Sequence, residues 1–597
     1  MRISRLTSHG ALLAVVACAL ALGGETVALT DGAAAVVSRP AGRAEARPSW
    51  HQAQEPAPIE AGVAPPPGVY APGIDVRHYE VEIGLASGAT TFDARVTIDV
   101  GITSDAPTMP LDLTGLAVRE VLVDSRPAPY DYADGKLRIA LPTARAGSRA
   151  EVTVAYGGTP DDGLILRENV HGQPAAFVDN WPNRTRFWLP TVDHPADKAT
   201  VRYTVHAPEA WQVIANGRLV NEGEPTPAGA IGPVSTGDRR TWVWQVDVPI
   251  STYNMVIGAA SFDVRTVGLA ACGRAPASRR PDGCVEVSTW MFPESADGAV
   301  PSFQRAAQMV DHFVSVIGDY PFEKLANVQS ATRFGGMENA SAIFYSERGI
   351  AGGRNIEGTV SHEIAHQWFG DAVTEADWHH LWLSEGFATY FGNQFFEAAD
   401  GVASFRERME SGRQRILQAE ESHRPVIDPD VGDLFALLNS NNYPKGAWVL
   451  HMLRGLVGDE AFFRGIRTYY RRHLHTAVLT DHFRWAMEDA SGRELGWFFT
   501  QWLYRPGFPV FDVAERWIAA DGGDGLMEVT LRQVQTPEWP RFRVPLELCW
   551  GDGAGRACRP AVSGSAEDTF RFRFETRPAG AVQVDPDGWV LKDLAAR

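Results

Sequence analysis

The hydrophobic pattern of this chain changes its period twice, and that change constrains the fold more than any other feature. From residue 78 to about 262, apolar and β-branched residues alternate with polar ones, as in TFDARVTIDV at 91–100. Such alternation is typical of strands with one buried face. At about 265–507 the apolar spacing is helical, and after residue 509 the alternation returns. The sequence therefore predicts a β domain, a mainly helical domain and a second β domain.

These segments predict a multidomain α+β protein. Its expected parts are an N-terminal antiparallel β domain at 69–262, a mainly helical domain at 263–510 and a C-terminal β-sandwich at 511–597. In the first domain, Asn216-Gly217 is a typical hairpin turn. In the second, two helices are expected at 444–456 and 481–490, each followed within two residues by a glycine.

The first thirty residues have the features of an export signal. Two arginines precede an apolar run at 11–24, and the first acid is Glu25. We expect a signal peptide at 1–30 and an exported protein, whether secreted, periplasmic or at the cell surface. Small residues before Cys18 also fit a lipid-attachment site, which is the alternative. Residues 31–68, rich in Ala and Pro, predict a linker, and no segment is long and apolar enough for a transmembrane helix.

Four cysteines follow the expected signal, and they form two pairs that are close in sequence. In an oxidising compartment, disulfides persist. The simplest pairing joins Cys272 to Cys284 and Cys549 to Cys558. Three pairings are possible in principle, and four free thiols are the alternative.

The charge of the chain excludes one class of partner as a first expectation. It has 73 acidic and 55 basic side chains, and its net charge is −18. Nucleic-acid binding requires clustered Lys and Arg to neutralise phosphates, and this chain has the opposite excess. We therefore expect no nucleic-acid partner.

The segment TVSHEIAHQWFG at 359–370 contains the pattern His-Glu-x-x-His. On a helix, His362 and His366 share one face, so both imidazoles can bind one metal while Glu363 lies beside them. For this pentapeptide alone, a surface helix with two solvated histidines is the alternative. A third ligand is needed to distinguish the two.

Glu385 supplies that third ligand. It follows His366 by nineteen positions, in WLSEGFATY, where Ser384 can cap a new helix. Two histidines and one glutamate leave a fourth position open, as in catalytic zinc sites. Zinc would activate a water molecule, and Glu363 could take its proton. We expect one zinc ion per chain.

A second motif, FGGMENA at 334–340, precedes the first histidine of the metal motif. Gly-Gly-Met-Glu-Asn, then His-Glu-x-x-His, then eighteen residues and Glu resembles the aminopeptidase N family of zinc gluzincins. Leukotriene hydrolase-like and aminopeptidase B-like relatives belong to the same group. The resemblance covers nearly all of the chain after the linker, and it implies a thermolysin-like fold for the helical domain.

In that family, the Gly-x-Met-Glu-Asn segment lies along the substrate as an edge strand. The resemblance implies that Glu338 holds the substrate's α-ammonium and that Gly335 and Gly336 contact the peptide with their backbones, with Met337 and Asn339 in the same substrate-binding segment. A buried ammonium needs a carboxylate partner, so a blocked N-terminus would be rejected.

Two further roles also depend on the resemblance. The segment NYPKGA at 442–447 matches the family's tyrosine near the start of a later helix, which implies that Tyr443 stabilises the oxyanion. Many members carry a Gln or Glu in the N-terminal domain that helps to bind the ammonium. This chain departs from that pattern and has Asp179 or Asn180 in the region; we choose Asp179, because a carboxylate offsets the ammonium charge.

The sequence thus predicts an exported zinc aminopeptidase that acts on peptides with a free N-terminus, with Glu363 as the base and Tyr443 at the oxyanion. A gluzincin endopeptidase and an epoxide hydrolase are alternatives within enzymes. A non-catalytic peptide-binding surface protein is the alternative of a different class. The sequence does not indicate an oligomeric state.

Overall fold

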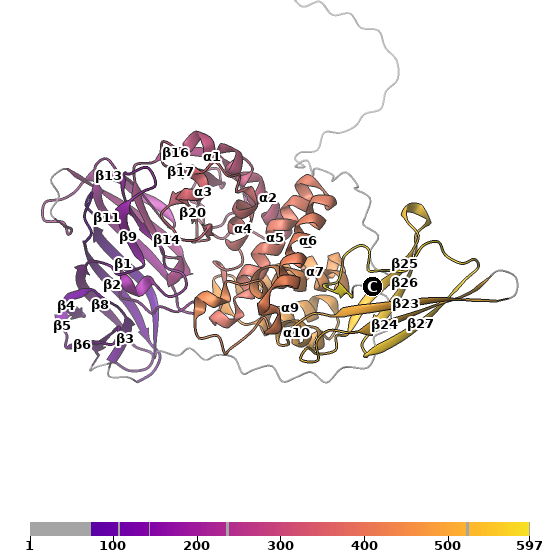
Figure 1. Ribbon diagram of the computed structural model, residues 1–597. Helices are drawn as coiled ribbons and strands as arrows, with labels where there is room; N and C mark the ends of the chain where they lie inside the picture. The colour runs from indigo at the N-terminus through magenta and orange to yellow at the C-terminus, as the bar shows by residue number, and fades with distance from the viewer. Residues whose placement is uncertain (1–72, 106–107, 142–143, 234–237, 521–523, 596–597) are drawn as a thin grey trace, which may run out of the picture. The chain divides into compact units, whose positions relative to one another are not determined.

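The computed structural model describes residues 73–595 except 106–107, 142–143, 234–237 and 521–523 (Figure 1). The expected signal at 1–30, the linker at 31–68 and Cys18 lie outside the described residues. A β-rich domain, a helical domain and a β-rich C-terminal region follow one another along the chain, so the predicted α+β fold is confirmed. In the part of the chain that is described, no helix has the length and apolar character to span a membrane.

The N-terminal domain consists of strands. They are β1 (Ile74–Gly84), β2 (Phe92–Ile102), β3 (Thr108–Asp112), β4 (Ala117–Val123), β5 (Arg126–Pro127), β6 (Tyr130–Ala133), β7 (Lys136–Ala140), β8 (Arg149–Gly158), β9 (Leu164–Glu168), β10 (Pro174–Val178), β11 (Lys198–Pro208), β12 (Gln212–Ala215), β13 (Arg218–Pro225), β14 (Arg239–Ser251) and β15 (Ile257–Ala260). The largest sheet has eight strands in the order β13-β14-β11-β1-β2-β8-β4-β5. Val81 of β1 lies opposite Tyr203 of β11 and Val96 of β2, and all three are fully buried. The alternating apolar residues thus form the core of this domain.

The eight-stranded sheet is antiparallel, as expected, except for β1 and β11, which pair in parallel. The expectation of a hairpin at Asn216-Gly217 is wrong. Asn216-Gly217 forms a turn with Gly217 at a φ of +75°, as its sequence indicates. The strands on either side do not pair with each other, however, because β12 pairs with β15 and β13 pairs with β14. The turn therefore leads from one sheet to another. Asn216 donates to the carbonyl oxygens of Asn254 and Ala340, so tertiary contacts fix this turn.

The helical domain opens with a five-stranded sheet. Its strands are β16 (Asp263–Ala270), β17 (Val285–Met291), β18 (Leu325–Ser330), β19 (Gly336–Met337) and β20 (Ala342–Ser346), in the order β16-β17-β18-β20-β19. The short β19 belongs to the Gly-Gly-Met-Glu-Asn motif and forms the edge of the sheet. An edge strand leaves backbone groups free to pair with an extended peptide. The motif therefore has the position that the resemblance implies.

Ten helices form in this domain, as the helical spacing of its apolar residues predicts. Two short strands, β21 (Val373–Glu375) and β22 (Thr476–Val478), pair with each other. The described helices are α1 (Ala296–Phe303), α2 (Ala306–Val316), α3 (Glu347–Ala351), α4 (Glu357–His366), α5 (Trp382–Asp400), α6 (Val402–Gln418), α7 (Gly446–Val457), α8 (Asp459–His473), α9 (Thr480–Ser491) and α10 (Gly496–Leu503). A π-helical turn at Asn441–Lys445 leads directly into α7. The expected helices at 444–456 and 481–490 correspond to α7 and α9.

Glycines allow α5 to approach its neighbours closely. A Cβ at Gly392 would lie 3.1 Å from the backbone nitrogen of His362 in α4. A Cβ at Gly386 would lie 2.9 Å from the Cα atom of Gly446 at the start of α7. Larger residues would separate these helices. The close packing brings the side chains of α4, α5 and the turn before α7 together.

The C-terminal region contains two sheets. Its strands are β23 (Val510–Ala519), β24 (Gly525–Gln533), β25 (Val544–Trp550), β26 (Ala557–Ser563), β27 (Glu567–Phe574), β28 (Gln583–Val584) and β29 (Asp593–Leu594). The sheet orders are β27-β24-β23-β29 and β26-β25-β28, and apolar residues of both sheets, among them Val529 and Leu546, are fully buried. This arrangement agrees with the expected sandwich.

The cysteine sulfur atoms lie at bonding distance in the simplest of the possible pairings. The Sγ atoms of Cys272 and Cys284 are 2.06 Å apart, and this pair spans the connection between β16 and β17. Those of Cys549 and Cys558 are 2.12 Å apart, at facing positions of β25 and β26.

Candidate active site

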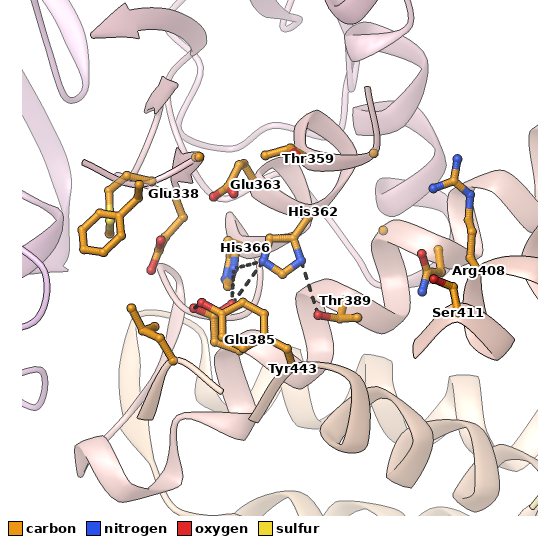
Figure 2. Close-up of a pocket in the computed structure, with 18 of the residues that line it drawn as sticks. Glu338, Thr359, His362, Glu363, His366, Glu385, Thr389, Arg408, Ser411 and Tyr443 are labelled. Atoms are coloured by element: carbon orange, nitrogen blue, oxygen red, sulfur yellow. Dashed lines mark hydrogen bonds and ion pairs between the residues drawn. The ribbon is translucent and has the colours of Figure 1, made fainter. Parts of the chain in front are cut away.

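The three expected metal ligands converge on one point. His362 and His366 lie one turn apart on α4, and Glu385 lies in the first turn of α5. The two Nε2 atoms are 3.0 Å apart, and Glu385 Oε2 lies 3.1 Å from His362 Nε2 and 3.2 Å from His366 Nε2. Figure 2 shows these side chains pointing toward one another. The structure thus brings together the residues that the spacing predicted.

This donor set fits a zinc ion. Bonds of about 2.0–2.2 Å in tetrahedral geometry place neighbouring donor atoms about 3.3–3.6 Å apart, a few tenths of an ångström more than the observed separations. His366 Nδ1 donates to the carbonyl oxygen of Phe369 at 3.0 Å. That bond fixes the tautomer and leaves the Nε2 lone pair available for a metal. Two imidazoles and one carboxylate leave a fourth position for water or substrate.

Ser384 has a different position from the one expected. Helix α5 begins at Trp382, so Ser384 lies inside the first turn and does not cap the helix. Its hydroxyl lies 3.1 Å from His366 Nδ1. Ser384 therefore helps to orient a metal ligand, a role that the local sequence pattern did not indicate.

Glu363 lies beside the ligands on α4, and β19 passes directly over it. A Cβ at Gly336 would lie 2.2 Å from Glu363 Oε1, so any side chain at this position would collide with the carboxylate. Burial is the main cause that raises the pKa of Glu363 well above its usual value, and the charges of Glu338 and Glu385 add to it. A bound dication favours the ionised form and so opposes this rise.

Glu338 follows β19 and is almost fully buried. Its carboxylate, the carboxylate of Glu363 and a nitrogen of His366 lie within 4.8 Å of one another. Burial raises the pKa of Glu338 to about 7, His366 opposes the rise and Glu385 adds to it. An ammonium group between these carboxylates would compensate for their burial. The arrangement suits the capture of a substrate amine next to the metal.

The rest of the motif is held in place by its backbone. Gln367, just after α4, donates to the backbone carbonyl oxygen of Glu338 at 2.8 Å and accepts from the Ser341 nitrogen at 2.7 Å. Met337 is buried, and Gly335 lines the cavity. Asn339 is buried with neither side-chain polar atom bonded to the described residues.

Tyr443 enters the site from the π-helical turn before α7. Its hydroxyl donates to Glu385 Oε1 at 2.7 Å, and its ring stacks on the His362 ring with centroids 5.8 Å apart. Burial raises the pKa of Tyr443 well above its usual value, and the charge of Glu385 adds to the rise. The phenol therefore keeps its proton and can donate it in a hydrogen bond next to the metal position.

Asp179 does not line the cavity. Its Oδ2 atom lies 3.0 Å from Arg184 Nη2 and 3.5 Å from Arg333 Nε, and its side chain is fully buried. Two guanidinium groups thus balance its charge, and we do not assign it the role of second amine anchor. The alternative, Asn180, is buried too and donates to the Met255 carbonyl oxygen at 2.7 Å.

The site lies in a cavity of about 730 Å³, and several of its walls were not predicted. Trp181, two residues beyond Asp179, is the lining residue that the N-terminal domain contributes, and its ring contacts that of Phe334. The remaining lining residues, to which the sequence assigned no role, are Gly358, Thr359, Thr389, Gly392, Asn393, Ser404, Glu407, Arg408, Ser411, Arg415 and Leu438. Neither His379 nor His380 lines this cavity. His379 instead hydrogen-bonds to Asp377, and His380 hydrogen-bonds to Thr480.

Comparison with known families agrees with this architecture. Residues 76–253 match the Peptidase M1 N-terminal domain, and residues 303–502 match the Peptidase family M1 domain. The second match contains the metal ligands, Glu363, Glu338 and Tyr443.

Individual relatives extend the comparison. Aminopeptidase N of Streptomyces lividans is 27% identical over 554 residues, which cover 86% of this chain and 61% of that protein. Tricorn protease-interacting factor F2 of Thermoplasma acidophilum is 27% identical over 74% of this chain and 54% of its own length. The chain thus spans between half and two thirds of these curated relatives.

Solved structures show the same fold. An M1 zinc metallopeptidase from Deinococcus radiodurans is 25% identical, has a TM-score of 0.62 and is matched over 95% of its length and 73% of this chain. Aminopeptidase A of Legionella pneumophila is 17% identical with a TM-score of 0.74 over 89% of this chain, a likeness of fold. From both domain matches, we conclude that the chain belongs to peptidase family M1.

Proposed function

We propose that this protein is a zinc aminopeptidase. One observation carries the proposal: the carboxylates of Glu338 and Glu363 lie within 4.8 Å of a nitrogen of the metal ligand His366. A peptide residue spans about 3.3–3.6 Å, so an amine held by Glu338 places the first peptide bond of the substrate at the metal. An endopeptidase would need space for residues before that bond.

The side chains of the site divide the reaction between them. Zinc bound by His362, His366 and Glu385 would polarise the substrate carbonyl and make water more acidic. Glu363 accepts the water proton and passes it to the departing amine nitrogen. Tyr443 donates a hydrogen bond to the substrate oxygen as that oxygen gains negative charge. This complete set disfavours a non-catalytic peptide-binding role.

We further propose that the protein binds one zinc ion per chain and that it is exported. A second cluster near the site, Glu338, Glu363 and His366, shares His366 with the ligand triad, so both cannot be filled independently. The signal-like residues 1–30 and the two cysteine pairs at bonding distance support an oxidising, extracytoplasmic location.

Paired substrates test this function. The zinc-loaded protein should hydrolyse an aminoacyl anilide and leave its N-acetylated counterpart essentially intact, because an acetamide has no charge for Glu338 to bind. Similar cleavage of the two compounds would contradict the proposal.

Replacement of Glu338 by glutamine keeps the shape of the side chain and removes its charge. We expect kcat/KM for a free aminoacyl substrate to fall about 10²–10³-fold, because a buried ammonium would lose its carboxylate partner. The preference for the free over the acetylated substrate should shrink with it, as measured by initial rates. A preference equal to that of the unmodified protein would exclude Glu338 as the amine anchor.

Replacement of Tyr443 by phenylalanine removes one hydroxyl. Since that group is expected to stabilise developing charge, kcat should fall about 10²–10³-fold with little change in KM. Tyr130, exposed on β6, provides a matched control whose change to phenylalanine should leave kcat unaltered. Steady-state kinetics of both variants measure this effect. A kcat for Tyr443→Phe within about fivefold of the unmodified value would show that Tyr443 does not stabilise the oxyanion.

A further inference from the structure

One face of helix α6 forms a wall of the active-site cavity. The lining residues of α6 recur at helical spacing, and they are Ser404, Glu407, Arg408, Ser411 and Arg415. Residues at such intervals project from one side of a helix. Figure 2 shows Arg408 and Ser411 on the opposite side of His362 from Glu338. The cavity therefore has a carboxylate at one end, the metal ligands in its middle and guanidinium groups at the other end.

Arg408 is held in place without a counterion among the described residues. Its guanidinium carbon lies 3.5 Å from the centre of the Phe396 ring. Stacking on an aromatic face fixes the plane of the guanidinium and leaves its N–H groups free at the edges. In the described part of the chain, neither Arg408 nor Arg415 forms an ion pair or donates a hydrogen bond.

Other arginines of α6 differ in this respect. Arg413 donates to Glu410 at 2.8 Å, and Arg406 lies 3.4 Å from Asp587, so both have carboxylate partners. Neither lines the cavity. The unpaired arginines of this helix are thus the ones that face the active site.

An unpaired, half-buried guanidinium favours an anionic ligand. Burial lowers the pKa of Arg408, and Asp400 and Glu357 act against this effect without restoring the usual value. Glu407 is the acidic residue among the α6 lining residues, and with two arginines the lining of this helix carries a net positive charge. Carboxylates and phosphates both match the guanidinium edge with two oxygens, and of these two a peptide carries the carboxylate.

We propose that Arg408 binds a substrate carboxylate downstream of the scissile bond, with Arg415 as a second contact about 10 Å further along α6. The inference depends on the proposed aminopeptidase function. The amine of the substrate lies at Glu338 and its first carbonyl at the metal, so the rest of the peptide continues away from Glu338, toward α6. The substrates favoured by this site are short peptides with a free C-terminus, or peptides with an acidic side chain at the matching position.

A series of peptides tests this site. Leucyl di-, tri- and tetrapeptides are compared as free acids and as C-terminal amides, and amidated peptides are compared with Glu or Gln at each downstream position. At one length, kcat/KM for the acid should exceed that for the amide by about tenfold or more, because a charged hydrogen bond is lost in the amide. An acid preference assigns the site to the C-terminal carboxylate, and a Glu preference assigns it to an acidic side chain. Ratios within twofold in every pair would overturn the proposal.

Variants identify the residue responsible. In Arg408→Gln, the acid-to-amide ratio of kcat/KM should fall to less than about two. In Arg408→Lys, which keeps the positive charge but loses the two parallel N–H donors of the guanidinium, part of the preference should persist. The acid and the amide are measured on the same preparation of each variant. An unfolded fraction therefore lowers both rates equally and leaves the ratio of the two kcat/KM values unchanged. Arg406→Gln, the matched change on another face of α6, should keep both the ratio and the activity. A full preference in both Arg408→Gln and Arg415→Gln would exclude these arginines.

Binding provides a readout independent of turnover. The zinc-loaded Glu363→Gln variant is titrated calorimetrically with a leucyl tripeptide and with its amide. Tighter binding of the acid, lost in the double variant with Arg408→Gln, supports the site even if no hydrolysis occurs, in which case the proposed catalysis alone fails. Equal affinity for the tripeptide and its amide, with no acid or Glu preference in the peptide series and normal anilide hydrolysis, would refute the carboxylate site and leave the aminopeptidase function intact.

Discussion

Replacing Glu363 with glutamine is expected to lower kcat for an aminoacyl anilide by about 10²–10⁴-fold, because general acid–base catalysis contributes about that much. The amide has the same shape but cannot accept the water proton. Zinc should stay bound, since Glu363 is not among the three converging ligand atoms. The experiment combines steady-state kinetics with metal analysis of the same preparation.

A matched control for this change lies on the same helix. Glu357 begins α4 and pairs with Arg305, which keeps Asp400 as a second partner if Glu357 is neutralised. Glu357→Gln should therefore retain kcat. If Glu363→Gln retained a kcat within about fivefold of the unmodified protein, or lost its zinc, Glu363 would not be the base.

Replacement of Glu385 by alanine is the second change with a very large expected effect. Two imidazoles alone bind zinc weakly, and Tyr443 loses its acceptor, so both zinc content and hydrolysis should fall, the latter at least about 10³-fold. The fold should persist, because buried aromatic residues hold the segment after α4 on α5, with the Phe369 and Phe387 rings 4.7 Å apart. Elemental analysis, kinetics and circular dichroism measure these three properties.

His379 is the control for this experiment. It lies in the segment before α5 and bonds to Asp377 and Val431, away from the ligands. His379→Ala should keep its zinc. Removal of the metal from the unmodified protein by a chelator should mimic Glu385→Ala, and added zinc should restore activity only in the unmodified protein. Full zinc content in Glu385→Ala would contradict the ligand assignment.

The sequence could predict the metal centre because its ligands are encoded locally. His362 and His366 are four residues apart on one helix, so they share a face whatever the helix packs against. Glu385 follows His366 by nineteen residues and lies in the first turn of the next long helix. The alternation of apolar residues likewise decides which segments become strands, whatever their partners. These features gave the order of domains, the three ligands and the position of Glu363.

The remaining features depend on contacts between distant segments. Asp179 was expected at the substrate amine, but Arg184 and Arg333 approach it in the fold and balance its charge. Asn216-Gly217 has the right local conformation and still joins two sheets. The register of α6 against α5, which places Arg408 in the cavity, follows from packing that has no pattern in the sequence.

The most direct test of the central claim is the identity of the first products from an unblocked peptide of about ten residues. The zinc-loaded protein is incubated with the peptide, and early time points are analysed by mass spectrometry. The account predicts release of the free N-terminal amino acid together with a peptide shortened by that one residue, because Glu338 places the substrate amine next to the metal. Internal fragments as the first products would contradict it.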